Sequence, residues 1–154
     1  MKASNLLFPH QLFQQHEFYS NGHPTYLVEE ALFFREFNFH KIKLVFHRAS
    51  MKSHAACLKE RGVDLQYISS EKELSDIRKL MVFLAKEGVQ QVNYIDPTDY
   101  WLERRIEKTA LEQGLHLDCF ENPLFINNKE DLKSFFKAEK KSFFQTTFYK
   151  QQRV

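Results

Sequence analysis

Glycine is scarce in this sequence, with 4 glycines among 154 residues, and their placement excludes one class of ligand site. A dinucleotide or Walker-type phosphate site needs a glycine-rich turn after a strand, so that the backbone can approach the phosphates. The segment that follows the first predicted strand reads FPHQLFQQ and contains no glycine. The sequence therefore argues against NAD binding and against Walker-type nucleotide binding.

Cysteine is scarcer still. Cys57 lies in a helical pattern and Cys119 in a strand pattern, and neither has a second cysteine at metal-ligand spacing. We therefore expect both to be small core residues in a reducing compartment, without a disulfide or a bound metal. No glycine elbow precedes a serine and neither cysteine has an evident base, so we predict no catalytic residue in this chain.

Excess charge and long apolar runs are absent too. The 22 basic and 20 acidic residues leave a net charge of +2, which predicts that this chain binds DNA only weakly and without specificity. Apolar runs stay well short of the roughly 18 residues that a membrane span needs, and the amino terminus lacks a signal-peptide pattern. We therefore expect a cytoplasmic protein with no membrane partner.

Three histidines recur at every seventh residue of one predicted helix. His40, His47 and His54 share one helical face, but seven residues of helix rise about 10.5 Å. That separation is too large for the ligands of a single zinc ion. The pattern favours a polar, half-exposed stripe.

Glycine and proline mark the ends of the predicted elements. Each glycine stands just before a strand-like run, and three of the prolines stand just after one: Gly22, Gly62, Gly88, Gly114, Pro9, Pro97 and Pro123. Helical patterns cover 40–61, 71–87 and 98–113, and the strands number five when the run at 5–8 is included. This alternation predicts an α/β fold, a Rossmann-like doubly wound parallel sheet in the order 3-2-1-4-5. We expect helices on both faces and strands that are buried on both sides.

The helix predicted at 40–61 has two apolar faces. One face contains Ile42, Val45, Phe46, Ala49 and Ala56, the other contains Leu44, Met51, Ala55 and Leu58, and a basic edge of Lys41, Arg48, Lys52 and Lys59 lies between them. A helix that is apolar on two faces is expected to be covered on two sides. One cover should be the sheet, and the other either the amino-terminal loop or a separate domain.

Polar side chains follow three of the predicted strands. His10 and Gln11 follow the first strand, Glu29 and Glu30 follow the second, and the segment 96–101, which ends in Tyr100 and Trp101, follows the fourth. In a doubly wound sheet these strand ends meet at one edge, where ligands bind. Amide, imidazole, carboxylate and aromatic groups together suit a flat heterocycle with polar edges, such as a pterin, lumazine or flavin.

Aromatic residues surround this predicted edge. Phe33, Phe34, Phe37 and Phe39 lead into the helix that His40 opens, in a loop that either closes over a ligand or packs beneath the domain's own helices. On the helix after Pro97, Trp101 shares a face with three cations, Arg104, Arg105 and Lys108. That face is either a solvated basic surface with an arginine over Trp101, or a docking or phosphate-binding surface.

Four segments, in order along the chain, carry a family resemblance. They are PHQL at 9–12, FHKIKLVFHRASMKSHA at 39–55, IDPTDYWLERR at 95–105 and FFQTTFYKQQR at 143–153. From about Leu7 to its last residue, the chain resembles the deoxyribodipyrimidine photolyase-related family, the bacterial cryptochrome/photolyase branch with an iron–sulfur cluster. The similarity covers the amino-terminal α/β domain of that family.

The resemblance implies a Rossmann-like domain that holds an antenna chromophore, a lumazine in members of this branch. PHQL stands where the family commonly has Gly-Asp-Gln-Leu, so Pro9 and His10 replace a glycine and a carboxylate before Gln11. Glu29, Glu30 and His40 fall in the next matched segment. We expect the cofactor-binding residues His10, Gln11, Glu29, Glu30, Phe33, His40, Tyr100 and Trp101. FAD and the iron–sulfur cluster are expected only in a carboxy-terminal helical domain.

Aromatic residues also crowd the carboxy terminus. We expect residues 1–142 to form the antenna-binding domain and residues 143–154 to begin a connection to the helical domain. Phe144, Phe148 and Arg153 recur at roughly helical spacing, so this connection should dock on the helical domain or on a second copy of the chain. The alternative function is a stand-alone Rossmann-like module that binds a small heterocycle or nucleotide.

Overall fold

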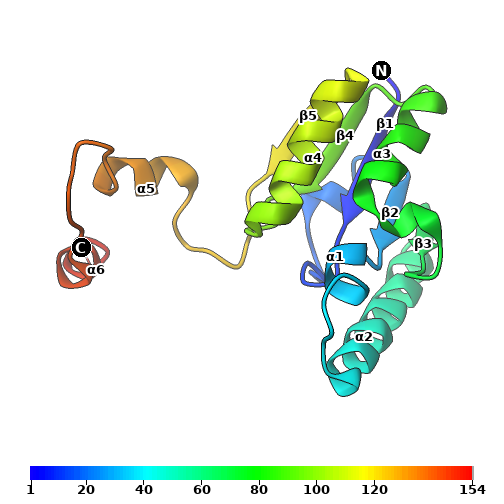
Figure 1. The fold of residues 1–154 in the computed structure, drawn as a ribbon, viewed down its shortest axis with the longest axis horizontal. Helices are drawn as coiled ribbons and strands as arrows, with labels where there is room; N and C mark the ends of the chain where they lie inside the picture. The colour runs from blue at the N-terminus through cyan, green and yellow to red at the C-terminus, as the bar shows by residue number, and fades with distance from the viewer. Residues whose placement is uncertain (154) are drawn as a thin grey trace. The chain divides into compact units, whose positions relative to one another are not determined.

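The computed structural model describes residues 1–153, which divide into two compact units, Met1–Asn122 and the chain from Pro123 onward. The first unit is built on a five-stranded parallel sheet (Figure 1). Its strands are β1 (Ala3–Leu7), β2 (Thr25–Val28), β3 (Leu65–Ile68), β4 (Gln91–Ile95) and β5 (His116–Phe120). They lie in the order β3-β2-β1-β4-β5, so the predicted fold class and strand order are confirmed.

Helices cover both faces of this sheet. Helices α3 (Ile77–Lys86) and α4 (Tyr100–Gln113) lie side by side on one face (Figure 1). They bury an apolar cluster that includes Leu6, Val92 and Leu102. Helix α2 (Lys41–Glu60) and the 3-10 turn η1 (Glu17–Tyr19) cover the other face, over Leu7 and Leu27. The short helix α1 (Ala31–Phe34) follows β2 directly and contributes to both clusters.

The helices begin and end where local chemistry favours a terminus. Gly88 and Gly114 have φ angles of +80° and +65°, the left-handed conformation that closes a helix and that other residues adopt at a cost. At the amino ends, the side chains of His40, Asp76 and Asp99 accept hydrogen bonds from backbone N–H groups of α2, α3 and α4.

Two predicted helix starts need correction. The helix expected from residue 71 is instead a 3-10 turn, η2 (Glu73–Ser75), followed by α3, because the Asp76 side chain caps a new start at Ile77. The helix expected from Thr98 starts at Tyr100, and Asp99 is its cap.

The crossover from β1 to β2 contains no α-helix, and an amide network holds it on the sheet. The Asn5 side chain, fully buried in β1, donates to the backbone oxygen of Phe18 at 3.1 Å and to Asn21 Oδ1 at 2.9 Å. It accepts from the Asn21 and Asn93 amides at 3.0 and 2.9 Å. Hydrogen bonds across the sheet therefore anchor the loop that takes the place of a covering helix.

Two expectations of burial were wrong, and a third is narrowed. Cys57 and Cys119 are both exposed, because Cys57 lies on the outer side of α2 and Cys119 lies on the edge strand β5. For the same reason β5 is largely exposed rather than buried on both sides. The apolar face of α2 that contains Ile42, Val45 and Phe46 is exposed, so the amino-terminal loop does not cover it, and cover by a separate domain stays a prediction.

The second unit contains two short helices, α5 (Lys129–Phe135) and α6 (Gln145–Gln151). Its centre is a cluster of phenylalanine rings, in which Phe148 lies 5.0 Å from Phe135 and 5.4 Å from Phe136, centroid to centroid. The boundary expected after residue 142 falls inside this unit. In the described part of the chain, residues 1–153, no helix combines the length and the apolar character of a membrane span.

Candidate functional site

A cavity of about 300 Å³ opens at the carboxyl ends of β1 and β4, where the strand order reverses. Four segments line it: the loop after β1, helix α1, the first turns of α2 and the loop after β4. The lining residues are Pro9, His10, Phe33, Lys43, His47, Pro97, Thr98 and Asp99. Position and size match a small-molecule site of a doubly wound sheet.

His10 forms one wall of this cavity. Its Nε2 lies 3.0 Å from the Pro97 carbonyl oxygen, and since a carbonyl can only accept, Nε2 carries the proton and donates it. Its ring contacts the Phe33 ring edge to face, with centroids 5.3 Å apart. Burial lowers the pKa of His10 below its ordinary value of 6.5 and outweighs the bond to Pro97. The imidazole is therefore neutral at neutral pH, and its Nδ1 keeps an acceptor lone pair.

Lys43 and His47 face the cavity from successive turns of α2. Burial, followed by the nearby Lys43 charge, lowers the pKa of His47 below 6.5, so this second imidazole is neutral as well. The Lys43 ammonium lies 4.1 Å from the centre of the Phe39 ring. The cavity thus offers an ammonium group, two neutral imidazoles and the carboxylate of Asp99.

The loop after β4 is held in a strained conformation. Thr98 has a φ angle of +51°, a region that β-branched residues rarely occupy. Asp96 and Asp99 flank it, and their carboxylates accept hydrogen bonds from the backbone N–H groups of Thr98 and Leu102. Strain of this kind costs about 1–3 kcal/mol and is concentrated at functional sites. In this conformation of the loop, Thr98 lines the cavity.

Glu29, at the end of β2, has an internal structural role. Its carboxylate accepts two bonds from Arg48 at 2.8 and 2.7 Å, one from the Tyr67 hydroxyl at 2.6 Å and one from the Ser70 N–H at 2.8 Å. Burial alone would raise the pKa of Glu29, but the four bonds outweigh it and lower the pKa to about 2. All its acceptor positions are used inside the protein, so it does not line the cavity.

Glu30 is buried in a different environment. One carboxylate oxygen lies 3.2 Å from Arg105, which also binds Glu36 at 2.6 Å, and the other oxygen has no hydrogen-bond partner among the described residues. Burial raises the pKa of Glu30 to about 7, more than Arg105 lowers it. The adjacent residues Glu29 and Glu30 therefore differ in charge near neutral pH.

Gln11 lies behind the cavity and holds the loop after β1 against the end of β4. Its side chain is fully buried, and Nε2 donates to the backbone oxygens of Ile95 at 2.8 Å and Asp96 at 3.1 Å. These bonds join the loop after β1 to the end of β4. Gln11 is therefore placed to position the loop that carries Thr98, rather than to line the cavity.

Three further residues of the predicted site lie outside the cavity. His40 is exposed and caps α2 by accepting from the Ile42 N–H. Tyr100 and Trp101 project from the exposed side of α4, with 60% and 62% of their surfaces accessible. The arginine expected over Trp101 lies instead over Tyr100, where Arg104 is 5.6 Å from the ring centre. Arg105, expected on the same exposed face, is held inward by Glu30 and Glu36.

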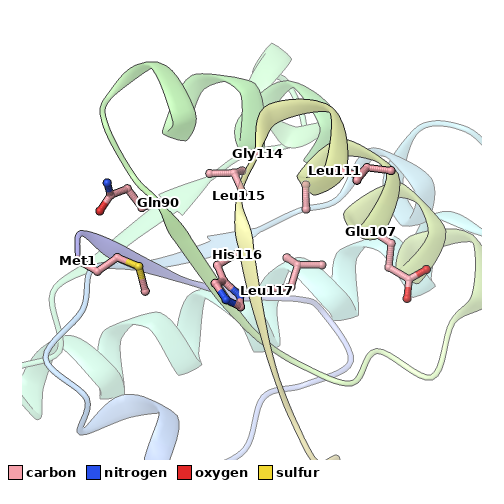
Figure 2. Close-up of a pocket in the computed structure, with 9 residues that line it drawn as sticks. Met1, Gln90, Glu107, Leu111, Gly114, Leu115, His116 and Leu117 are labelled. Carbon is pink, nitrogen blue, oxygen red and sulfur yellow. The ribbon is translucent and has the colours of Figure 1, made fainter.

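A wider hollow of about 710 Å³ lies at the opposite edge of the sheet, between α4 and β5 (Figure 2). Leu111, Leu115 and Leu117 supply much of its lining, and Glu107 and His116 stand apart on different elements (Figure 2). A ligand site needs a few polar groups that converge on one position. The cavity at the strand carboxyl ends meets that condition, and the hollow between α4 and β5 does not.

Reasoning from the sequence placed His10 and Phe33 correctly at the strand ends and missed Lys43 and His47. His47 was visible in the row of histidines, and Lys43 precedes it by four residues, so both lie on one helical face. That signal identifies the face but does not show which turn of α2 passes the ends of the strands. Only the fold supplies that information.

Comparisons with known proteins agree with this structure. A protein of Acanthamoeba polyphaga mimivirus, described as uncharacterized, is 32% identical over 160 residues, covering 97% of this chain and 80% of that protein. The model of the family described as deoxyribodipyrimidine photo-lyase-related protein matches residues 5–154, nearly the whole chain. The four matching segments lie within that range, as does the parallel sheet apart from the first two residues of β1. The chain belongs to the deoxyribodipyrimidine photolyase-related protein family.

Proposed function

We propose that this chain is the amino-terminal antenna-chromophore-binding or regulatory domain of a photolyase- or cryptochrome-related flavoprotein, which acts in light-dependent DNA repair or in light sensing. The cavity at the reversal of strand order supports this proposal best. It brings two neutral imidazoles, an ammonium group and an aromatic ring together in one small space. Membership of the family supports the link to photolyases.

The residues of the cavity fit a bicyclic heterocycle such as a lumazine or pterin, or the ring system of a flavin. Such rings have N–H donors and carbonyl acceptors along their edges and a flat face. His10 Nδ1 would accept from a ring N–H, Lys43 would donate to a ring carbonyl, and Phe33 would contact the face. A volume of about 300 Å³ is at the lower end for small-molecule sites, which favours a single ring system over a dinucleotide.

A whole FAD is too large for a cavity of about 300 Å³, and an iron–sulfur cluster lacks a set of ligands in this chain. A cluster held by thiolates uses four cysteines, and the sequence has two, Cys57 and Cys119, on different elements. We therefore assign both groups to a helical partner domain, where the redox chemistry of repair would take place. The role of this chain is to hold a chromophore that absorbs light and passes the excitation to that flavin.

Titration of the chain with a ribityl-lumazine tests the proposal. We expect a shift of the near-ultraviolet absorbance band on binding, and about a tenfold or greater loss of affinity in Lys43→Ala, because a charge-assisted hydrogen bond is removed. Lys41→Ala is the matched control, since Lys41 lies on the same turn of α2 and does not line the cavity. A titration with lumazine, pterin and flavin that produced neither a spectral nor a calorimetric change would overturn the proposal.

A further inference from the structure

The exposed face of α2 is a continuous apolar stripe. Ile42, Val45 and Phe46 have 72%, 68% and 70% of their surfaces accessible, and Ala49 continues the row one turn further along the exposed face. These four residues, named here the α2 stripe, recur at i, i+3, i+4 and i+7, which places them on one side of the helix. Single exposed apolar side chains are ordinary, whereas a contiguous row marks a contact surface.

Lysines of α2 border this stripe on both sides. Lys41, Lys52 and Lys59 form one edge of the helix, and Lys43 lies toward the other. All four lysines are exposed, and helix α2 contains no acidic residue before Glu60. The one further cation on α2, Arg48, is already paired with Glu29. A surface that binds the α2 stripe must therefore tolerate or neutralise a row of lysines.

The sheet already occupies the opposite side of the helix. Met51 and Leu58 are fully buried there, and Ala55 is nearly so. The α2 stripe points away from that core, and the crossover loop from β1 to β2 packs on the sheet through Phe18 and Asn5 instead. Within Met1–Asn122, no element covers the stripe.

We propose that the α2 stripe docks an amphipathic helix of another domain or protein, whose apolar face is edged by carboxylates. The spacing of Ile42, Val45 and Phe46 forms the kind of ridge that packs into the groove of a second helix. Beyond Phe46, the same side of α2 carries small residues, Ala49, Ser53 and Ala56, which allow a helix backbone to approach closely. Carboxylates on the partner would pair with Lys41, Lys52 and Lys59 along one edge.

Two other occupants fit the stripe less well, one because of its charge and one because of its shape. A second copy of α2 would bring lysines to lysines along the contact, which costs affinity. A membrane surface needs a broad face of large apolar side chains, and this stripe has only three before it turns to alanine and serine. A helix with acidic edges satisfies both the shape and the charge.

Two designed helical peptides of equal length test the proposal on the full chain. Both carry leucine at i, i+3, i+4 and i+7, one with glutamate and the other with lysine at the flanking positions. Binding is measured by fluorescence anisotropy of labelled peptide at low and high salt. We expect the glutamate peptide to bind at least about tenfold more tightly than the lysine peptide, with affinity that falls as salt rises.

Variants connect the binding to the stripe. Phe46→Gln should lower the affinity for the glutamate peptide about tenfold or more. The double variant Lys41→Glu, Lys52→Glu should bind the lysine peptide more tightly than the glutamate peptide. Leu111→Gln is the matched control, because Leu111 is an exposed leucine on α4, away from the stripe. Circular dichroism shows that each variant is folded, which exposed positions should allow.

Three results would overturn the proposal. The first is equal affinity for both peptides, or no binding of either. The second is sedimentation with phosphatidylglycerol vesicles that Phe46→Gln abolishes, which would make the stripe a lipid contact. The third is a dimer in light scattering that Phe46→Gln dissociates, which would make a second copy the occupant.

Discussion

Two neighbouring residues, Glu29 and Glu30, show how far a side chain's role depends on its surroundings. Both follow β2 and both are fully buried, so the sequence alone presents them as equivalent. Glu29 meets four donors, and Glu30 meets one arginine that it shares with Glu36. Their pKa values are consequently about 2 and about 7, on opposite sides of the ordinary value of 4.5. The two residues should give opposite dependences of stability on pH.

For Glu29 we predict a loss of stability in acid. Its folded-state pKa of about 2 lies below the unfolded value of 4.5, so its stabilisation is complete above pH 4.5 and is lost as the pH falls toward 2. The difference corresponds to about 3 kcal/mol. Denaturant unfolding between pH 5 and pH 2 measures this loss, which should be absent in Glu29→Gln. An unchanged slope in that variant would contradict the prediction.

For Glu30 the sign is reversed. Between pH 4.5 and 7 the folded chain holds a proton on Glu30 that the unfolded chain has released, so the free energy of unfolding falls as pH rises. We expect the stability of the wild type relative to Glu30→Gln to decrease by about 3 kcal/mol across this interval. Glu36→Gln is the control, because it removes the other carboxylate that binds Arg105 and leaves Glu30 to titrate. Because the lowered pKa values of His10 and His47 raise stability over the same interval, the test is the comparison with the variant: equal changes of stability with pH in the wild type and in Glu30→Gln would be evidence against this prediction.

At the scale of elements, the crossover from β1 to β2 depends on one amide. Replacing Asn5 by alanine removes the partner of Asn21 and Asn93 and the donor to Phe18. Each buried group left unsatisfied costs about 1–3 kcal/mol, so we expect Asn5→Ala to destabilise the chain by about 2–4 kcal/mol.

Hydrogen exchange locates the effect of this substitution. The amides of residues 14–24 should lose protection in Asn5→Ala, while those of α4 keep theirs relative to global unfolding. Asn127→Ala is the comparison, because Asn127 is outside the sheet. Uniform loss of protection throughout the first unit would mean that the amide does not anchor the loop specifically.

The elements were far more predictable than the site. Glycines at helix ends and prolines at strand ends mark breaks that depend only on local backbone geometry, so the strand order followed from the sequence. The roles of Gln11, Glu29 and Arg105 depend on partners distant in the sequence, which periodicity does not reveal. The sequence left the cover of α2's second apolar face open for a related reason, because a periodic pattern shows that a face is apolar and not what lies against it.

At the scale of the whole molecule, charge is divided unevenly between the two units. From residue 123 onward there are 7 basic and 3 acidic residues, and the first unit contains the remaining 15 basic and 17 acidic residues. The second unit also exposes Phe144 and Tyr149. We propose that residues 143–154, of which Val154 lies outside the described residues, dock on a helical domain or on a second copy of the chain.

A pair of substitutions tests this segment. Phe144 is exposed and Phe148 packs on Phe135, so Phe144→Ser should reduce self-association without loss of stability, whereas Phe148→Ser should disrupt the ring cluster. Light scattering at increasing concentration and thermal unfolding measure the two effects. A strictly monomeric chain at high concentration, together with a core-like loss of stability in Phe144→Ser, would count against docking through this segment.

The amides that anchor the crossover loop also bear on how the sheet forms. Thr25, Asn5, Asn93 and Asp118 lie opposite one another on four adjacent strands, all on the face that α2 and η1 cover. A slip of one residue would turn Asn5 or Asn93 into the apolar layer beneath α3 and α4, without partners. Leucine and valine tolerate either alignment of their strands, whereas a buried amide does not. This polar row therefore penalises misaligned strand pairs once α3 and α4 pack on the sheet.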